Sequence, residues 1–153
     1  MEEFVGSEVT RVFAAPCEAV FDAWVTPASL AAWWGGSGIE IPLESVAMDV
    51  RPGGAWKATM IVGQGVPDFH WRGEFIEVRR PTRLSLTMTD EPGEERELLS
   101  VTLTAVDGGT EMQFTQTGGH LSPEQYAQTT GGWQLAFDTM DTILAASSRR
   151  STV

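Results

Sequence analysis

Between residues 43 and 117, apolar side chains recur at every second position in one segment after another. A period of two is that of a β-strand, whose successive side chains point to opposite faces of a sheet. Short turns such as Asp107-Gly108-Gly109 separate the segments, and turns of this length join antiparallel neighbours. The pattern predicts six consecutive strands in one antiparallel sheet, over residues 43–50, 55–62, 69–78, 83–89, 97–106 and 110–117.

Residues outside this run add a seventh strand and the helices. Residues 8–13 alternate enough to form the first strand. Two short helices are expected over 14–25 and 27–34, because each has a proline suited to a first turn. Thr26 should cap the second of these helices, and Gly35-Gly36 should end it.

The C-terminal segment predicts a longer amphipathic helix. SPEQ at 122–125 is a capping box, and Gly131-Gly132 is expected to break or kink the helix that it opens. Beyond that point an apolar stripe forms at spacings of three and four. A sheet with one apolar face needs a cover, and this is the only element long enough. The stripe consists of Trp133, Phe137, Met140 and Leu144.

The sequence therefore predicts an α+β fold in which a seven-stranded, curved antiparallel sheet surrounds a long C-terminal helix. Two short helices follow the first strand. A strongly curved sheet touches one helix mainly along its axis, so a gap is expected, with the short helices at one end. At 153 residues, the chain is predicted to form a single domain over 1–153, with its core at about 8–147.

Charge and cysteine content exclude several functions. A net charge of −11 argues against nucleic acid and against anionic membranes, both of which attract basic surfaces. Cys17 is the one cysteine, so no internal disulfide or thiolate zinc cluster can form, and a buried small side chain is expected there. The N-terminus has no secretory signal and no segment has the length of a membrane span, so a cytoplasmic location is expected. The sequence shows no His-x-x-x-His pair or acidic cluster for a metal, no phosphate-binding loop and no nucleophile elbow, so no metal or cofactor is expected.

Five blocks of sequence carry a family resemblance. In this order and spacing the chain resembles the domain family named after the activator of the heat-shock protein 90 ATPase, in the START-like (SRPBCC) helix-grip superfamily. The resemblance covers about residues 8–147 and implies the helix-grip fold, but its members bind or process unrelated ligands. Eukaryotic co-chaperones of this family have a separate chaperone-binding domain for which 153 residues leave no room, so chaperone activation is not implied. The blocks are APCEAVFDAWVTPASLAAWWGG, DVRPGGAWKATM, RGEFIEVRRPTRLSLT, GGTEMQFTQTG and GGWQLAFDTM.

The predicted gap points to a ligand cavity rich in methionine and tryptophan, side chains that suit a flat or variable apolar molecule. Alternatively, these bulky groups simply fill the gap. Trp33 and Trp34 are about 100° apart on a helix, so one is expected in the core and the other at the cavity entrance, unless both are core. The predicted ligand-binding residues are Trp33, Trp34, Trp56, Met60, Phe69, Trp71, Met88, Met112, Phe114, Trp133, Phe137 and Met140.

The strand over 69–78 breaks its own alternation, because Trp71 and Ile76 have opposite parity. A bulge near Gly73 would let both face the interior. Strict alternation would instead direct the polar side chains inward and build a catalytic or anion-binding site. Those polar side chains are Asp68, His70, Arg72 and Glu74.

Three functions follow from these observations. We expect binding of a small, largely hydrophobic molecule between the sheet and the C-terminal helix, with no assigned catalytic residue. The first alternative is an enzyme of the cyclase or hydrolase type that uses His70, Arg72 and Glu74 inside the cavity; the other histidine, His120, is expected in a solvated loop. The second alternative is a chaperone-associated partner-binding domain, which an exposed apolar patch around Leu135 would favour. The sequence leaves open whether the chain forms a homodimer.

Overall fold

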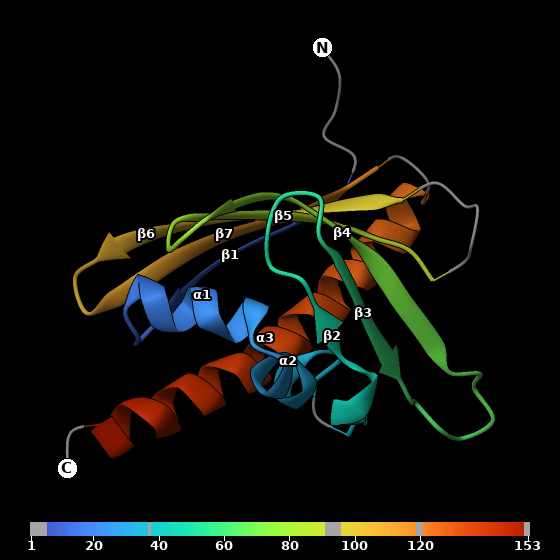
Figure 1. The fold of residues 1–153 in the computed structure, drawn as a ribbon, viewed down its shortest axis with the longest axis horizontal. Helices are drawn as coiled ribbons and strands as arrows, with labels where there is room; N and C mark the ends of the chain where they lie inside the picture. Colours follow the sequence, from blue (N-terminus) through green and yellow to red (C-terminus); the bar gives the residue numbers. More distant parts are fainter. Residues whose placement is uncertain (1–5, 37, 91–95, 119–120, 152–153) are drawn as a thin grey trace.

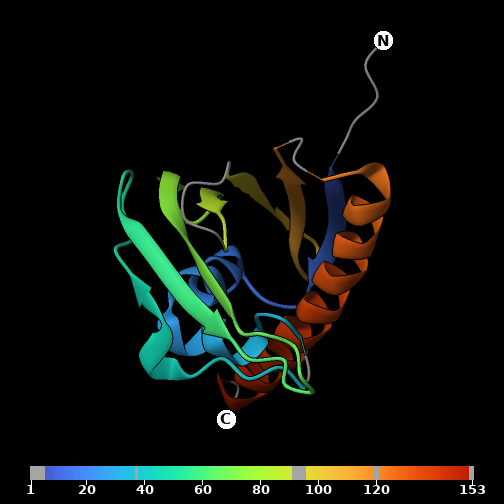
Figure 2. The same ribbon diagram turned by 90° about the vertical axis from the view of Figure 1, so that its right-hand side faces the viewer.

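The computed structural model describes residues 6–36, 38–90, 96–118 and 121–151; His120 lies outside them. Seven strands form one antiparallel sheet in the order β1-β7-β6-β5-β4-β3-β2. The three α-helices lie on one side of the sheet, which curves round them (Figure 1 and Figure 2). This is the predicted α+β architecture. Its elements are β1 (Ser7–Phe13), α1 (Cys17–Val25), α2 (Pro27–Trp33), a 3₁₀ helix η1 (Leu43–Ser45), β2 (Ala47–Met48), β3 (Ala55–Met60), β4 (Phe69–Arg79), β5 (Arg83–Met88), β6 (Glu97–Val106), β7 (Gly109–Thr117) and α3 (Pro123–Ser151).

Helix α2 begins and ends at residues with special backbone properties. Pro27 lies in its first turn, where the fixed φ of proline suits a helix. Thr26 occupies the N-cap position, but its side chain makes no capping hydrogen bond, so that part of the prediction is wrong. After the helix, Gly35 has a φ of 85°. A Cβ there would lie 2.8 Å from a carbon of Ile39 and 3.0 Å from one of Met60, so the sharp exit from the helix needs glycine.

Helix α3 starts at the predicted capping box. The backbone nitrogen of Gln125 donates to Ser122 Oγ at 3.1 Å, and the backbone nitrogen of Ser122 donates to Gln125 Oε1 at 2.8 Å. The predicted break at Gly131-Gly132 is wrong, because α3 runs through both glycines without interruption over its 29 residues. Glycine lowers helix stability by about 1 kcal/mol without interrupting the hydrogen-bond ladder. Tyr126 and Trp133, both buried, anchor the helix on either side of the pair.

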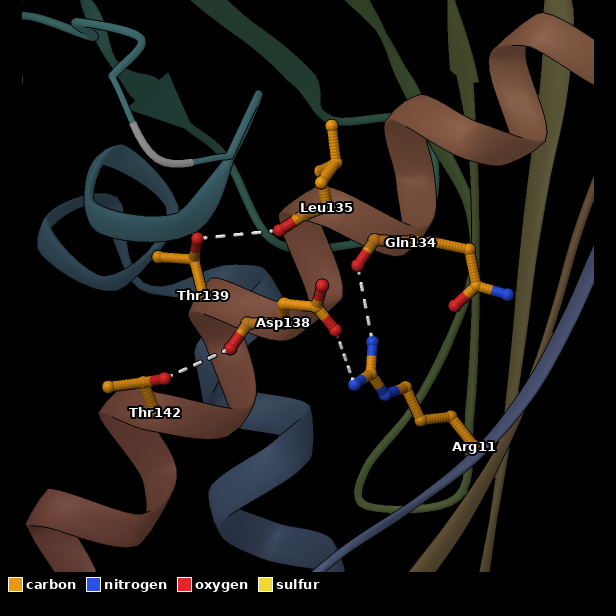
Figure 3. A network of polar contacts seen from close by, with 6 residues as sticks. All are labelled: Arg11, Gln134, Leu135, Asp138, Thr139 and Thr142. Atoms are coloured by element: carbon orange, nitrogen blue, oxygen red, sulfur yellow. Dashed lines mark hydrogen bonds and ion pairs between the residues drawn. The ribbon is translucent and has the colours of Figure 1, made fainter.

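A polar contact fixes α3 beside β1 (Figure 3). The Arg11 guanidinium, on β1, lies 2.6 Å from Asp138 Oδ1 and donates to the Gln134 carbonyl oxygen at 3.2 Å. Nearer the start of the helix, the buried Ser7 hydroxyl donates to the Tyr126 carbonyl oxygen at 2.9 Å. These contacts set the position of α3 across the concave face of the sheet.

The segment predicted as a strand over 43–50 is mostly not one. Residues Leu43–Ser45 form a 3₁₀ turn, and the strand is only two residues long. The Ser45 hydroxyl donates to the Pro42 carbonyl oxygen at 2.6 Å and accepts from the Thr59 nitrogen at 3.1 Å. This serine therefore takes up backbone groups that a strand ladder would otherwise pair.

Strand β4 contains a bulge close to Gly73, as predicted, but the bulge does not turn Ile76 inward. The register shifts between Phe75 and Glu77, and the extra residue, Ile76, is 52% exposed, so the expected inward position of Ile76 is wrong. Gly73 has a different reason to be glycine. A Cβ there would lie 1.8 Å from the Thr87 carbonyl oxygen and 2.8 Å from Nε1 of the Trp56 indole, which donates to that same oxygen.

Candidate functional site

One half of the space between the sheet and α3 is filled with aromatic rings. Trp24 of α1 lies at the centre of this half. Its ring centroid lies between 4.8 and 6.3 Å from those of Trp33, Phe114, Trp133 and Phe137. Except for Trp133, which also reaches the other half, each of these side chains is at most 2% exposed. We call this region the filled half.

The other half contains a cavity of about 550 Å³ that is partly open to solvent, and its volume is within the range of small-molecule sites. Its wall comes from strands β3 to β7, from the end of α2, and from the N-terminal half of α3. We call this region the open half. The residues that line it are Trp34, Gly35, Met60, Trp71, Met88, Thr89, Asp90, Glu97, Gln116, Leu121, Thr129, Gly132, Trp133 and Ala136.

The adjacent tryptophans of α2 face different halves. Trp33 is fully buried, and its indole nitrogen donates to the Ala23 carbonyl oxygen at 2.7 Å. The helix ends there, and Trp34 has extended dihedral angles, which direct its side chain to the cavity wall. The Trp34 and Trp133 rings meet edge to face, with centroids 5.1 Å apart. The structure therefore places Trp33 in the core and Trp34 at the cavity.

A hydrogen-bonded chain of three side chains crosses the floor of the cavity. The Trp133 indole nitrogen donates to Gln116 Oε1 at 2.7 Å, and Gln116 Nε2 donates to Glu97 Oε1 at 3.1 Å. Glu97 is only 8% exposed. Its other oxygen, Oε2, is buried and has no hydrogen-bond partner among the described residues. The same is true of the indole nitrogen of Trp71, which also lines the cavity.

Comparison with known proteins identifies the family. The family described as Activator of Hsp90 ATPase homolog 1-like protein matches residues 14–145. The chain belongs to this family. No curated protein matches the sequence.

Solved structures of other proteins have the same fold as this member of the Activator of Hsp90 ATPase homolog 1-like family. A protein from Chromobacterium violaceum has 23% identity and a TM-score of 0.79 over 91% of this chain and 96% of its own. The AHSA1 protein from Silicibacter pomeroyi has 20% identity and a TM-score of 0.80 over 94% and 99%. The AHSA1-like protein from Aeromonas hydrophila has 26% identity and a TM-score of 0.73 over 92% and 94%.

Only some of the residues predicted to bind a ligand lie on the cavity wall. Those on the cavity wall are Trp34, Met60, Trp71, Met88 and Trp133. The others do not line it: Trp33, Met112, Phe114, Phe137 and Met140 are fully buried in the core, Trp56 is buried over Gly73, and Phe69 stacks on Trp71 with centroids 5.5 Å apart.

Sequence reasoning missed the polar part of the wall, although a signal was present. Glu97 has the same parity in its strand as Leu99, and Gln116 has the same parity as Phe114. Period two therefore puts both polar side chains on the inner face. On α3, the wall residues Thr129, Gly132, Trp133 and Ala136 follow the helical spacing of three, four and seven.

The candidate catalytic group lies on the other face of the sheet. His70 and Glu74 are exposed, and His70 Nδ1 lies 3.2 Å from the Thr59 hydroxyl. Arg72 lines a separate hollow together with Lys57 and Glu74. The prediction that these groups could enter the cavity is wrong, because the bulge comes after Phe75 and leaves the inward parity of Trp71 intact.

Two further features lie away from the cavity. The exposed Arg80 guanidinium donates hydrogen bonds to the Asp22 carboxylate, and this contact raises the pKa of Arg80 above its usual value. Leu135, on which the partner-binding alternative depends, is 62% exposed and is the one large exposed apolar side chain in the described part of α3.

Within the described residues, no group of three His, Cys, Asp or Glu side chains could hold a metal ion, and no helix has the length and hydrophobicity to cross a membrane.

Proposed function

We propose that the protein binds a small, largely apolar molecule in the open half of the space between the sheet and α3. The observation that carries the proposal is the contrast within one interior. Aromatic rings pack the filled half, while about 550 Å³ is left in the other half. The cavity is partly open to solvent and its wall is mainly apolar. Apolar surface left against water costs free energy, and a small-molecule site is a concave space with a lining of this kind, so the cavity favours an apolar occupant.

The wall chemistry supports an apolar occupant. Trp34, Trp71 and Trp133 offer large, rigid aromatic surfaces, and Met60 and Met88 offer adaptable thioethers. Ligand sites of this size combine a mainly apolar lining with a few polar groups that fix orientation. The START-like fold family commonly binds ligands, which agrees with this proposal.

Binding is favoured over nucleophilic catalysis by the polar groups of the wall. The described wall residues include two acids, two threonines and one glutamine, but no histidine, cysteine, serine or lysine. Nucleophilic catalysis by a serine or cysteine paired with a histidine, or by a lysine, therefore has no members among these described wall residues.

A titration with N-phenyl-1-naphthylamine, a neutral apolar fluorophore, tests the proposal. Gly132 lines the cavity and Gly131 does not, and a Cβ on either would meet nothing within 4 Å. We expect micromolar binding by the wild type, a loss of at least about tenfold in Gly132→Leu, whose side chain enters the cavity, and wild-type binding in Gly131→Leu. Absence of binding by the wild type, or an equal loss in the two variants, would contradict the proposal.

A further inference from the structure

We infer that the ligand of this cavity carries a protonated amino group, which Glu97 binds, and that carboxylate ligands are rejected. The inference rests on the proposed function and specifies its ligand class as an apolar, preferably aromatic amine. It follows from the one-sided hydrogen bonding of Glu97, from the charges of the wall, and from the three indoles.

The hydrogen-bonded chain makes Oε1 of Glu97 an acceptor. The Trp133 indole nitrogen can only donate, so the amide oxygen of Gln116 must face it, as observed. The amide nitrogen is then left to face Glu97 and donates to Oε1. Gln116 makes no bond to the second oxygen, so Oε2 of Glu97 is a buried oxygen that has no donor among the described residues. Burying such a group costs free energy unless a partner satisfies it.

No described protein cation balances Glu97. The described residues of the wall include Asp90 and Glu97 but no lysine, arginine or histidine. The arginines that form ion pairs in the described chain do so elsewhere, with Asp22, Asp49, Glu77 and Asp138. The chain as a whole carries a charge of −11. The local and the overall field therefore both attract a cation and repel an anion.

The aromatic part of the wall suits the same ligand. Trp34, Trp71 and Trp133 surround the cavity, and tryptophan is the best aromatic partner for a cation. An apolar amine can thus place its ring against the indoles and its ammonium N–H groups on Glu97. The indole N–H of Trp71, which has no acceptor among the described residues, can donate to a neutral oxygen elsewhere on such a molecule.

Three compounds that share one ring system test this inference by isothermal titration calorimetry at neutral pH. They are 1-naphthylmethylamine, 1-naphthylmethanol and 1-naphthoic acid, which differ in the charge carried beside the same ring. We expect the amine to bind wild-type protein about tenfold more tightly than the alcohol and about 100-fold more tightly than the acid. Added salt should weaken binding of the amine and leave that of the alcohol nearly unchanged.

Two variants assign the preference to one residue. Glu97→Gln removes the charge with little change in size, and the amine should lose its advantage over the alcohol. Glu8→Gln removes one negative charge from an exposed position on β1, and should leave all three affinities within about twofold of wild type. If Glu97→Gln does not fold, the three-compound series and its salt dependence on the wild type still decide the question.

The outcomes separate the inference from the function on which it rests. Equal or tighter binding of the alcohol or the acid by the wild type would overturn the inference. So would an amine preference that persists in Glu97→Gln. If binding is independent of charge but is lost in Gly132→Leu, the proposed function stands and the inference fails. If neither these compounds nor N-phenyl-1-naphthylamine bind, the proposed function itself fails.

Discussion

The filled and open halves are built from the same strands, yet they differ in the side chains that these strands turn inward. On β6, Val101 and Leu103 face inward along the filled half, and Glu97 faces inward at the cavity. On β7, Met112 belongs to the filled half and Gln116 to the cavity. The strand period is unchanged between the halves, so the difference lies in side-chain chemistry and not in backbone geometry.

Helix α3 shows the same division along its length. Phe137 and Met140 are fully buried against the sheet, whereas Gly132 and Ala136 lie on the cavity wall. Small residues one turn earlier on the helix leave space that large ones fill further on. The comparison teaches that the curved sheet does not by itself create the cavity, since the same sheet and helix close completely where bulky side chains are supplied.

The largest expected effect comes from opening the filled half. Phe137→Ala should lower the free energy of unfolding by about 3–5 kcal/mol, because it removes a fully buried ring that meets four other rings. Urea unfolding followed by circular dichroism measures the loss. A loss below about 1 kcal/mol would mean that the two halves do not differ in packing.

A pair of methionines allows the packing of the two halves to be compared with the same substitution, methionine to alanine. Met140→Ala, in the filled half, should cost several kcal/mol, near the upper end of the range of about 2–5 kcal/mol for this substitution. Met88→Ala, on the cavity wall, should lie at or below the lower end, because the side chain has fewer neighbours to lose. The same urea experiment measures both, and equal losses would count against the division.

The adjacent tryptophans allow a test at neighbouring positions. Trp33→Phe should cost about 1–3 kcal/mol, because it leaves the buried Ala23 carbonyl oxygen without its donor, with little change in N-phenyl-1-naphthylamine affinity. Trp34→Phe should change that affinity more and stability less. Parallel unfolding and titration measurements check both, and a reversed assignment would place Trp33 at the cavity.

The smallest effects are expected at the glycine pair of α3. Gly131→Ala and Gly132→Ala should each raise the free energy of unfolding by up to about 1 kcal/mol, since both are helical and a Cβ meets nothing nearby. Only the second should alter probe affinity, because Gly132 alone of the two lines the cavity. Thermal unfolding and titration of the two variants provide the measurement.

Much of the fold was predictable because it depends on the spacing at which apolar residues recur along the chain. Alternation in β5, β6 and β7 and the stripe from Trp133 to Leu144 fixed the sheet and its covering helix. Where side-chain hydrogen bonds replaced the backbone hydrogen bonds between strands, as at Ser45, the predicted strand was wrong. The role of Gly73 was misinterpreted, because glycine is required there by the close approach of Trp56, a residue distant in sequence.

The cavity was harder to predict than the fold. Sequence reasoning chose the bulkiest inward side chains, such as Phe114 and Phe137, but bulky side chains close a gap as readily as they line one. The residues that keep the space open are small, such as Gly132 and Ala136, or polar, such as Glu97. Their contribution depends on which strand end meets which turn of α3, and that is tertiary information.

The most direct test of the division uses the indole N–H signals of the six tryptophans in ¹H–¹⁵N NMR spectra. Each half contributes reporters, and tryptophan-to-phenylalanine variants assign the signals. During titration with N-phenyl-1-naphthylamine, Trp34, Trp71 and Trp133 should shift, since they line the cavity, while Trp24, Trp33 and Trp56 should stay nearly fixed. Shifts as large at Trp24 and Trp33, or no shift at any of the six, would contradict a binding cavity confined to the open half.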